Sequence, residues 1–247
     1  MPVGPTDWQR AAVAAVPGTR FFVLTGGPGT GKTTTVVRML LMLLRHARAC
    51  GLPEGPSIAL AAPTGKAAQR LVQAIAKGKA DLQTALNPVG AHPVRDSSPS
   101  RGEELRTQGA LLQRIPHADA RTLHRLLGYQ PRDNSFARGP HNPLAEDIVV
   151  VDEASMVDLA MMRQLLEAMR PDAVLILLGD PGQLASVDAG SVLADIVASV
   201  PDNPLPPALA ERLAPLLQHA PPASMDSSPL AGQVLTLVHS WRAGSGL

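Results

Sequence analysis

The chain has 247 residues, of which 45% are hydrophobic and 2% aromatic, and its formal net charge is +1. This length accommodates one large or two small domains, and the scarcity of aromatic residues requires a core of Leu, Val, Ala and Ile. The near-neutral charge excludes a surface that is basic throughout, so a nucleic-acid-binding face would have to be a local patch. Residues 1–20 lack the apolar segment of a signal peptide and the apolar runs are too short to span a bilayer, so we expect a cytoplasmic protein without membrane contact.

A phosphate-binding loop is the strongest local signal in the N-terminal part of the chain. The apolar run Phe21–Leu24 predicts a buried strand, and Lys32–His46 predicts a helix. The segment LTGGPGTGKTTT at Leu24–Thr35 connects them and contains the spacing G-x-x-x-x-G-K-[ST]. Its glycines let consecutive backbone N–H groups turn inward on a polyphosphate, and the helix N-terminus adds its positive dipole end. The segment therefore predicts binding of ATP or GTP.

This loop also predicts how the nucleotide and Mg²⁺ are held. Lys32 can reach the β- and γ-phosphates, and the Thr33 hydroxyl can ligate Mg²⁺. The residues that we expect to contact the nucleotide are Gly27, Pro28, Gly29, Thr30, Gly31, Lys32, Thr33 and Thr34.

Further along the chain, short apolar runs alternate with segments of helical length. The additional strands are predicted at Ile58–Ala61, Ile148–Val151 and Val174–Leu178, and the helices at Gly65–Ala76, Leu159–Met169 and Ser191–Val200. This alternation predicts an α/β fold with a parallel sheet flanked by helices. In such sheets, ligands bind at the carboxyl ends of the strands.

Two segments interrupt the alternation. Residues 77–118 are rich in turn-forming residues and predict a flexible surface insertion. Residues 201–229 are rich in Pro and Ala and predict a linker, with a possible helix at Ala208–His219, that leads to a further strand at Val234–Val238.

Two carboxylates and an amide follow the later strands. Asp152 and Glu153 come directly after Ile148–Val151, where Asp152 would hold Mg²⁺ through its water shell and Glu153 would polarise the attacking water. Gln183 follows Val174–Leu178 in the segment GDPGQL and would sense the γ-phosphate, although a simple Pro-Gly turn is the alternative. The paired carboxylates favour hydrolysis over transfer to a substrate hydroxyl.

With these motifs in place, the sequence resembles superfamily 1 helicases and specifically the RecD family, the alpha subunits of exodeoxyribonuclease V. The matching segments, in the family's order, are TDWQRAA at 6–12, LTGGPGTGKTTT at 24–35, AAPTGKAAQRL at 61–71, TLHRLLG at 122–128, VVDEASMVDL at 150–159, LGDPGQLASVDAGSVLADI at 178–196 and SWR at 240–242.

The resemblance implies a RecA-like P-loop domain and an ATP-driven motor that moves 5′ to 3′ on single-stranded DNA. It also implies RecB-like and RecC-like partner subunits and a role in double-strand break repair and recombination. By the same resemblance, Gln9 would read adenine, Arg242 would approach the γ-phosphate, and residues 128–143 would form a small β-hairpin that helps to part strands.

The resemblance further suggests contacts to DNA phosphates, each of which has a plain structural alternative. Thr64 and Lys66 follow a predicted strand and open a helix, and Thr122 and His124 lie at another predicted helix start. Hydroxyls, cations and helix N-termini are the groups with which a translocase holds phosphates. Alternatively, Thr64 and Thr122 are only helix caps and His124 is a packed side chain.

Compared with the family, the sequence predicts a fragment. We expect residues 1–200 to form the RecA-like ATPase domain and 201–247 to form a linker and the start of a truncated second RecA-like domain. Ala243 also stands where the family carries an aromatic residue. Docking on the partner subunits would then be impaired. An ATP- and DNA-binding but hydrolytically inactive fragment is one alternative, and a P-loop ATPase that acts on RNA or protein is another.

Overall fold

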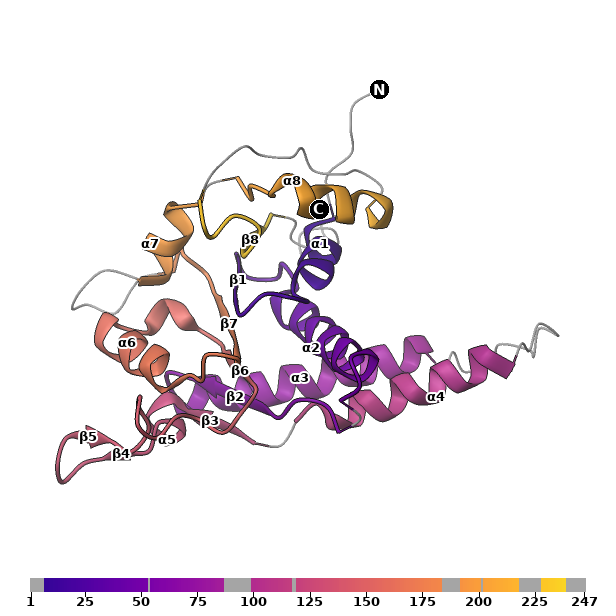
Figure 1. The fold of residues 1–247 in the computed structure, drawn as a ribbon. Helices are drawn as coiled ribbons and strands as arrows, with labels where there is room; N and C mark the ends of the chain where they lie inside the picture. The colour runs from indigo at the N-terminus through magenta and orange to yellow at the C-terminus, as the bar shows by residue number, and fades with distance from the viewer. Residues whose placement is uncertain are drawn as a thin grey trace, which may run out of the picture.

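The computed structural model describes residues 7–52, 54–86, 99–116, 119–183, 192–200, 202–217 and 228–238. Six strands form one sheet in the order β3-β2-β6-β7-β1-β8, and every neighbouring pair is parallel (Figure 1). They are β1 (Phe21–Gly26), β2 (Ile58–Ala62), β3 (Ala120–Thr122), β6 (Ile148–Val151), β7 (Val174–Gly179) and β8 (Val234–Leu237). The predicted α/β fold with a parallel sheet flanked by helices is confirmed.

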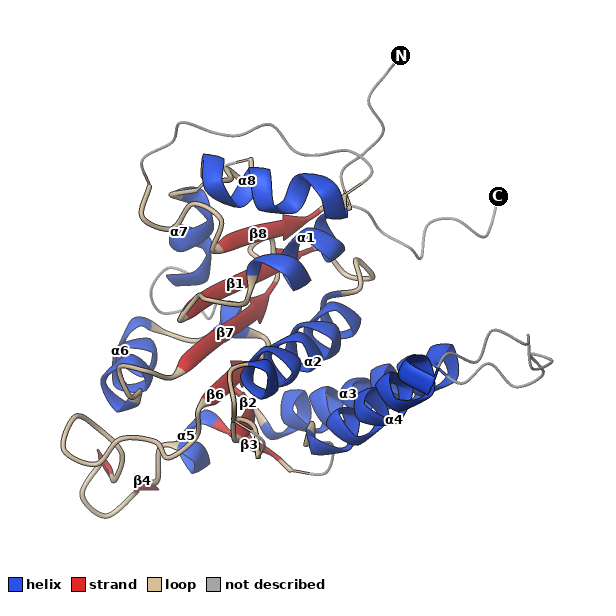
Figure 2. Ribbon diagram, turned by 45° about the vertical axis from the view of Figure 1, so that its right-hand side comes forward, coloured by secondary structure: helices blue, strands red, loops and turns tan. Residues whose placement is uncertain are grey.

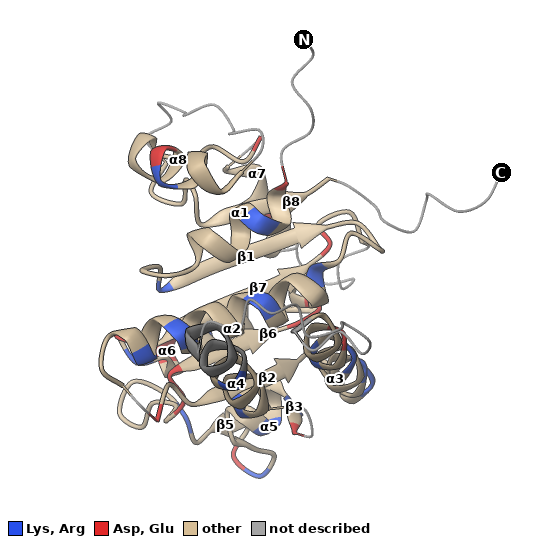
Figure 3. Cartoon of the chain, turned by 90° about the vertical axis from the view of Figure 1, so that its right-hand side faces the viewer, with Lys and Arg blue, Asp and Glu red and all other residues tan. Residues whose placement is uncertain are grey.

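Apart from the edge strand β3, which contains the exposed Arg121, the strands are predominantly apolar because both faces of the sheet are buried. Strands β1, β2, β6, β7 and β8 contain no charged residue, as Figure 3 shows. Successive side chains of a strand point to opposite faces. In β1, Phe22 and Leu24 lie in one apolar core and Val23 in the other, and in β6 Val150 and Val149 divide in the same way. A parallel sheet covered on both faces therefore appears in the sequence as continuous apolar runs.

Helices cover both faces of the sheet (Figure 2). One face packs against α1 (Trp8–Ala15), α2 (Lys32–Ala49), α3 (Gly65–Leu86) and α8 (Pro207–Leu213), with α4 (Pro99–Arg114) packed on α2 and α3. The other face packs against α5 (Leu123–Leu126), α6 (Leu159–Ala168) and α7 (Val192–Ala198). The segments η1 (Ala154–Met156) and η2 (Ala214–Leu216) are short 3-10 helices. Within the described ranges, no helix combines the length and apolar character that crossing a membrane requires.

The expectation of a flexible insertion at 77–118 is wrong for the two ends of that segment that the structure describes. Residues 77–86 continue α3, and 99–114 form α4. Leu111, Leu112 and Ile115 are buried in the core, and the buried Lys79 Nζ donates a hydrogen bond to the carbonyl of Ile115 at 2.7 Å. The turn-forming residues between the two helices, at 87–98, lie outside the described residues. They hid the helical spacing of the apolar residues on either side.

The boundary expected at residue 200 also requires correction. Strand β8 pairs in parallel with β1, and α8 contacts α1. The Thr25 and Thr236 hydroxyls are hydrogen bonded at 2.9 Å, and the side chain of Asn203 both donates to and accepts from the backbone of Thr236. The first domain therefore extends to at least residue 238, because β8 buries its apolar side chains on the same sheet.

A small hairpin projects from the end of the sheet that carries β3 (Figure 2). Strands β4 (Tyr129–Gln130) and β5 (Ser135–Phe136) pair antiparallel within the predicted segment 128–143. The Tyr129 hydroxyl donates to Asn134 Oδ1 at 2.8 Å across the turn. The rings of Tyr129 and Phe136 lie 5.2 Å apart, centroid to centroid.

Candidate nucleotide-binding site

The loop between β1 and α2 has the backbone conformation that its glycines permit. Gly26 and Gly31 have φ angles of +150° and +85°, and α2 begins directly after Gly31. A Cβ atom at Gly26 would lie 2.7 Å from the carbonyl oxygen of Leu237, and one at Gly31 would lie 2.5 Å from Gln9 Nε2. Both positions therefore favour glycine for conformation, and Gly26 also lacks space beside the Leu237 backbone, whereas at Gly31 the end of the Gln9 side chain would have to move.

Two side chains hold this loop in shape. The half-buried Lys32 donates from Nζ to the carbonyl oxygens of Gly26 at 2.5 Å and Gly27 at 3.1 Å. The Thr30 hydroxyl donates to the same Gly27 carbonyl at 2.9 Å. Thr33 and Thr34 lie half-buried in the first turn of α2. The predicted nucleotide-contacting residues are thus gathered in one turn of loop and the start of one helix.

Gln9 lies against this loop from a separate helix. Its Nε2 donates to the carbonyl oxygen of Thr30 at 2.8 Å, so α1 is fastened to the loop. A cavity of about 610 Å³ adjoins Gln9, and Val13, Arg38 and Met42 are among its lining residues. The residue predicted to read adenine is therefore placed between the phosphate-binding loop and a cavity with both apolar and cationic walls.

Asp152 and Glu153 lie at the same edge of the sheet as the loop. They follow β6, which is separated from β1 only by β7. The Asp152 N–H donates to the carbonyl of Ala61 at 2.9 Å, and its Oδ1 accepts from the Glu153 N–H at 2.9 Å. Glu153 has a left-handed backbone with φ of +52°. Strained non-glycine conformations of this kind cluster at functional sites.

The pKa of Asp152 reflects both its burial and its neighbours. Burial is the main cause that raises this pKa above its ordinary value, and the charge of Glu153 adds to the increase. The hydrogen bond from Glu153 and the positive charge of Lys32 act in the opposite direction and lower the pKa. The carboxylate predicted to organise the metal is therefore close enough to Lys32 to feel its charge.

The donor set suits Mg²⁺ bound mainly through water. Among the described residues there is no group of three or more His, Cys, Asp or Glu side chains that could enclose a metal ion. Mg²⁺ keeps several waters and takes one or two carboxylates together with substrate phosphates, so Thr33 and Asp152 fit such a site.

The turn after β7 positions Gln183 through a residue that sequence reasoning did not identify. Asp180 is buried, and its Oδ1 accepts from the Gly182 N–H at 3.0 Å while its Oδ2 accepts from Gln183 Nε2 at 3.4 Å. Gln183 itself is exposed. The Asp-Pro-Gly order, a turn signal, could have identified Asp180 as the organiser. Arg242 lies outside the described residues.

The four residues predicted to bind DNA lie at the carboxyl edge of β2 and β3. Ala62 and Thr122 are paired in the sheet, so the segments that follow these strands are neighbours. The hydroxyl oxygens of Thr64 and Thr122 accept hydrogen bonds from the N–H groups of Ala67 at 3.2 Å and Arg125 at 3.3 Å, as helix caps do. Lys66 is exposed in the first turn of α3.

His124 has the packing that its structural alternative predicts. Its ring stands edge-on to Tyr129 with centroids 5.2 Å apart, and it lies 6.0 Å from Phe136. The side chain nevertheless remains exposed at this edge of the sheet. The structure brings the four residues together, and their capping and packing roles are present whether or not they contact DNA.

Comparison with known proteins gives the family. A family model described as an AAA domain matches residues 9–189. The chain is 47% identical over 192 residues to the RecBCD enzyme subunit RecD of Mycolicibacterium smegmatis, which covers 76% of this chain and 30% of that protein. It is 43% identical over 195 residues to the RecBCD enzyme subunit RecD of Haemophilus influenzae, covering 79% of this chain and 27% of that protein.

A third relative is named as a helicase and not as a RecBCD enzyme subunit. The ATP-dependent RecD2 DNA helicase of Deinococcus radiodurans is 34% identical over 198 residues, covering 80% of this chain and 21% of that protein. The matched regions thus span less than a third of each of these relatives. The resemblance to the RecD family is confirmed: the chain belongs to the AAA domain family and, within it, is related to the RecD proteins.

Proposed function

We propose that this chain is the ATP-hydrolysing motor domain of a RecD-type DNA helicase and couples ATP turnover to 5′ to 3′ movement on single-stranded DNA. The observation that carries the proposal is the placement of Lys32, at the start of α2 after β1, and Asp152, directly after β6, at one edge of the sheet, where the positive charge of Lys32 acts on Asp152. The relationship to RecD and RecD2 proteins supports DNA as the track.

Each residue of the site has a definite part in hydrolysis. The Lys32 ammonium exchanges the carbonyls of Gly26 and Gly27 for the β- and γ-phosphate oxygens of ATP, which are stronger acceptors. Asp152 and the Thr33 hydroxyl would hold Mg²⁺, which would supply positive charge to the phosphates. Glu153 orients and polarises the attacking water, and Gln183 responds to the presence of the γ-phosphate.

The base of ATP and the DNA strand lie on either side of this centre. We infer that Gln9 exchanges its bond to the Thr30 carbonyl for the adenine edge, with the base in the adjoining cavity. Thr64, Lys66, Thr122 and His124 hold phosphates of the single strand, and the β4–β5 hairpin meets the duplex ahead of them. By relationship to RecBCD subunits, RecB-like and RecC-like proteins are the proposed partners in break repair, in the cytoplasm.

The test is ATP hydrolysis by the whole chain with and without oligo-dT, in wild type and in Lys32→Ala and Glu153→Gln variants. We expect DNA-stimulated turnover that falls about 10²-fold or more in both variants, because Lys32 acts on the reacting phosphate and Glu153 acts on the attacking water. Lys77→Ala, which removes an exposed lysine from α3, is the matched control. Turnover that is unaffected in the Lys32→Ala variant would refute the assignment of the site.

A second candidate is a domain that binds ATP·Mg²⁺ without hydrolysing it. In this architecture hydrolysis takes place in a cleft between two RecA-like domains. A chain that binds ATP·Mg²⁺, as seen in a thermal shift lost in Lys32→Ala, but releases no phosphate would be a binding half-site. Glu153→Gln would then leave the thermal shift unchanged.

A further inference from the structure

We propose that the groove between α3 and the β3–α5 segment is a subsite for one whole nucleotide of the single strand. Arg125 binds its phosphate, and Gln69 and Gln73 bind the edge of its base. The inference rests on the proposed function and adds three side chains to the four residues expected to hold phosphates. It predicts that this part of the track recognises the base as well as the backbone.

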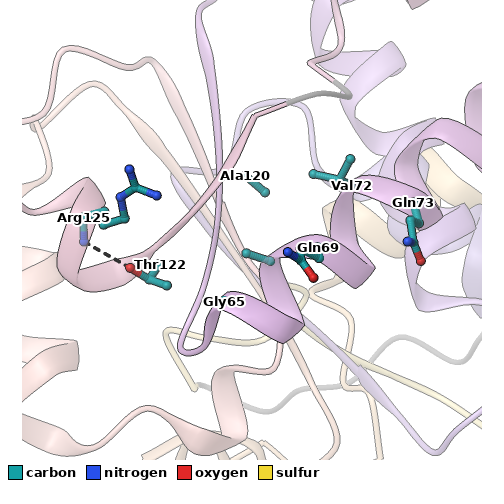
Figure 4. A pocket seen from close by; sticks show the side chains of 8 residues that line it. Gly65, Gln69, Val72, Gln73, Ala120, Thr122 and Arg125 are labelled. Carbon is teal, nitrogen blue, oxygen red and sulfur yellow. Dashed lines mark hydrogen bonds between the residues drawn. The ribbon is translucent and has the colours of Figure 1, made fainter.

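The groove is a defined cavity of about 350 Å³ at the carboxyl edge of the sheet. Figure 4 shows Arg125 reaching from α5 on one side, and Gln69 and Gln73 projecting from α3 on the other, with Ala120 of β3 between them. Gln69 and Gln73 are four residues apart on a helix and therefore share one face. Ala120 and Thr122, two residues apart on β3, both line the same cavity.

The polar groups of this cavity are available to a ligand. Within the described residues, the side chains of Arg125, Gln69 and Gln73 make no hydrogen bond or ion pair, and all three are exposed. Arg125 is fixed through its backbone, where the N–H donates to Thr122 Oγ1 and the carbonyl accepts from the Gly128 N–H at 3.2 Å. By contrast, Arg121 in the neighbouring strand is already paired with Asp119 at 2.9 Å. Arg125 is therefore the cation that an incoming phosphate would meet in this cavity.

The chemistry of the walls selects a nucleotide over an isolated anion. One guanidinium matches one phosphate, while two amides offer both donors and acceptors, which is what the edge of a base presents. Ala68, Val72 and Ala120 supply an apolar floor for the flat face of the base. Thr64 and Lys66, at the start of α3, lie one turn before Gln69, so the cavity continues the predicted track of the strand.

The role of Arg125 is tested by binding of fluorescent oligo-dT to the full chain at several salt concentrations. We expect Arg125→Ala to weaken binding on the order of fivefold and to reduce the slope of log K against log salt by about 0.7, the value for one single-strand phosphate. Arg48→Ala, which removes an exposed arginine at the far end of α2, controls for lost charge. An Arg125→Ala slope equal to that of Arg48→Ala would overturn the phosphate assignment.

The role of the two glutamines is tested with oligo-dT and an abasic strand of the same length. We expect the Gln69→Ala/Gln73→Ala double variant to weaken oligo-dT binding on the order of fivefold and leave abasic binding unchanged, because only the base contacts are lost. Gln83→Ala, further along α3, is the matched control. Equal effects on both strands would refute base contact.

Failure of the subsite can be distinguished from failure of the proposed function. If wild type binds oligo-dT and Thr64→Ala/Lys66→Ala weakens binding while the cavity variants do not, only the subsite is wrong. If wild type does not bind oligo-dT at all, both the proposed DNA-binding function and the subsite are refuted. A thermal shift with ATP·Mg²⁺ in every variant verifies that each is folded.

Discussion

At the scale of single residues, the site depends on backbone conformations that few side chains permit. Gly31 combines a left-handed φ of +85° with close approach to Gln9, and Glu153 takes a left-handed φ of +52° beside Asp152. The glycine pattern was visible in the sequence because the loop motif requires it. The left-handed backbone conformation of Glu153 was not visible in the sequence, because nothing local to Asp-Glu-Ala specifies a left-handed residue.

Gly31→Ala separates conformational strain from crowding when compared with Gly18→Ala. Both glycines have nearly the same φ, +85° and +89°, but a Cβ at Gly18 meets no atom within 4 Å. We expect Gly18→Ala to lower the free energy of unfolding by about 1–2 kcal/mol, the cost of a left-handed residue. Gly31→Ala should cost more than this and should also weaken ATP binding, because Gln9 must move. Equal losses in urea unfolding would contradict the contact with Gln9.

Asp152→Asn tests the raised pKa. A folded-state pKa above the unfolded value means that ionised Asp152 opposes folding, and that this cost disappears as pH falls through the folded pKa. We therefore expect the variant to melt above wild type at pH 8 without nucleotide, and the difference to shrink towards pH 4. Stabilisation by ATP·Mg²⁺ should be lost in the variant. A difference in melting temperature that stays constant across this range would show that the pKa is not raised.

At the scale of elements, short local signals were sufficient to predict the strands but not to predict α4, which packs on α2 and α3. Strands β1, β2, β6 and β7 lie where continuous apolar runs predicted them. Helix α4 was missed because Pro and Ser residues around it outweigh its few apolar positions, which bury themselves only against α2 and α3. Tertiary packing, and not propensity, supplies most of the stability of such a helix.

Leu112→Ala tests whether α4 is a docked part of the core. Leu112 is fully buried, so its truncation should lower the free energy of unfolding by about 2–5 kcal/mol. Gln113→Ala, at the next and exposed position, should change it by less than about 0.5 kcal/mol. Chemical denaturation measures both. If both variants changed the free energy of unfolding by similarly small amounts, the original prediction of a flexible insertion would be supported instead.

At the scale of the whole molecule, one sheet collects residues from both ends of the described chain. Strand β8 pairs with β1, and α8 lies beside α1. The sequence predicted β8 as a strand but placed it beyond a linker, since a sequence alone does not show which neighbour a strand will choose. In the folded chain, Thr236 reaches Thr25 and Asn203 together and ties the segment to the first domain.

Truncation after residue 200 should therefore disrupt the domain. The shorter chain loses the buried Leu205, Leu213, Val234, Leu235 and Leu237. At about 1.5–3 kcal/mol for each buried side chain, the loss is comparable with the whole stability of a domain. It also exposes the edge of β1. Cooperative thermal unfolding of the 1–200 chain would contradict this prediction.

The sequence by itself determined the features that depend on residues close together in the chain. The phosphate-binding loop, the Asp152–Glu153 pair after its strand and the α/β class all follow from spacing and apolar runs, because short-range sterics and burial specify them. Only the tertiary structure decided which segments meet: Gln9 with Thr30, Lys32 with Asp152, β8 with β1, and Arg125 with Gln69 across one groove. These contacts depend on strand order and packing, which arise from the burial of the whole core at once and leave no local pattern in the sequence.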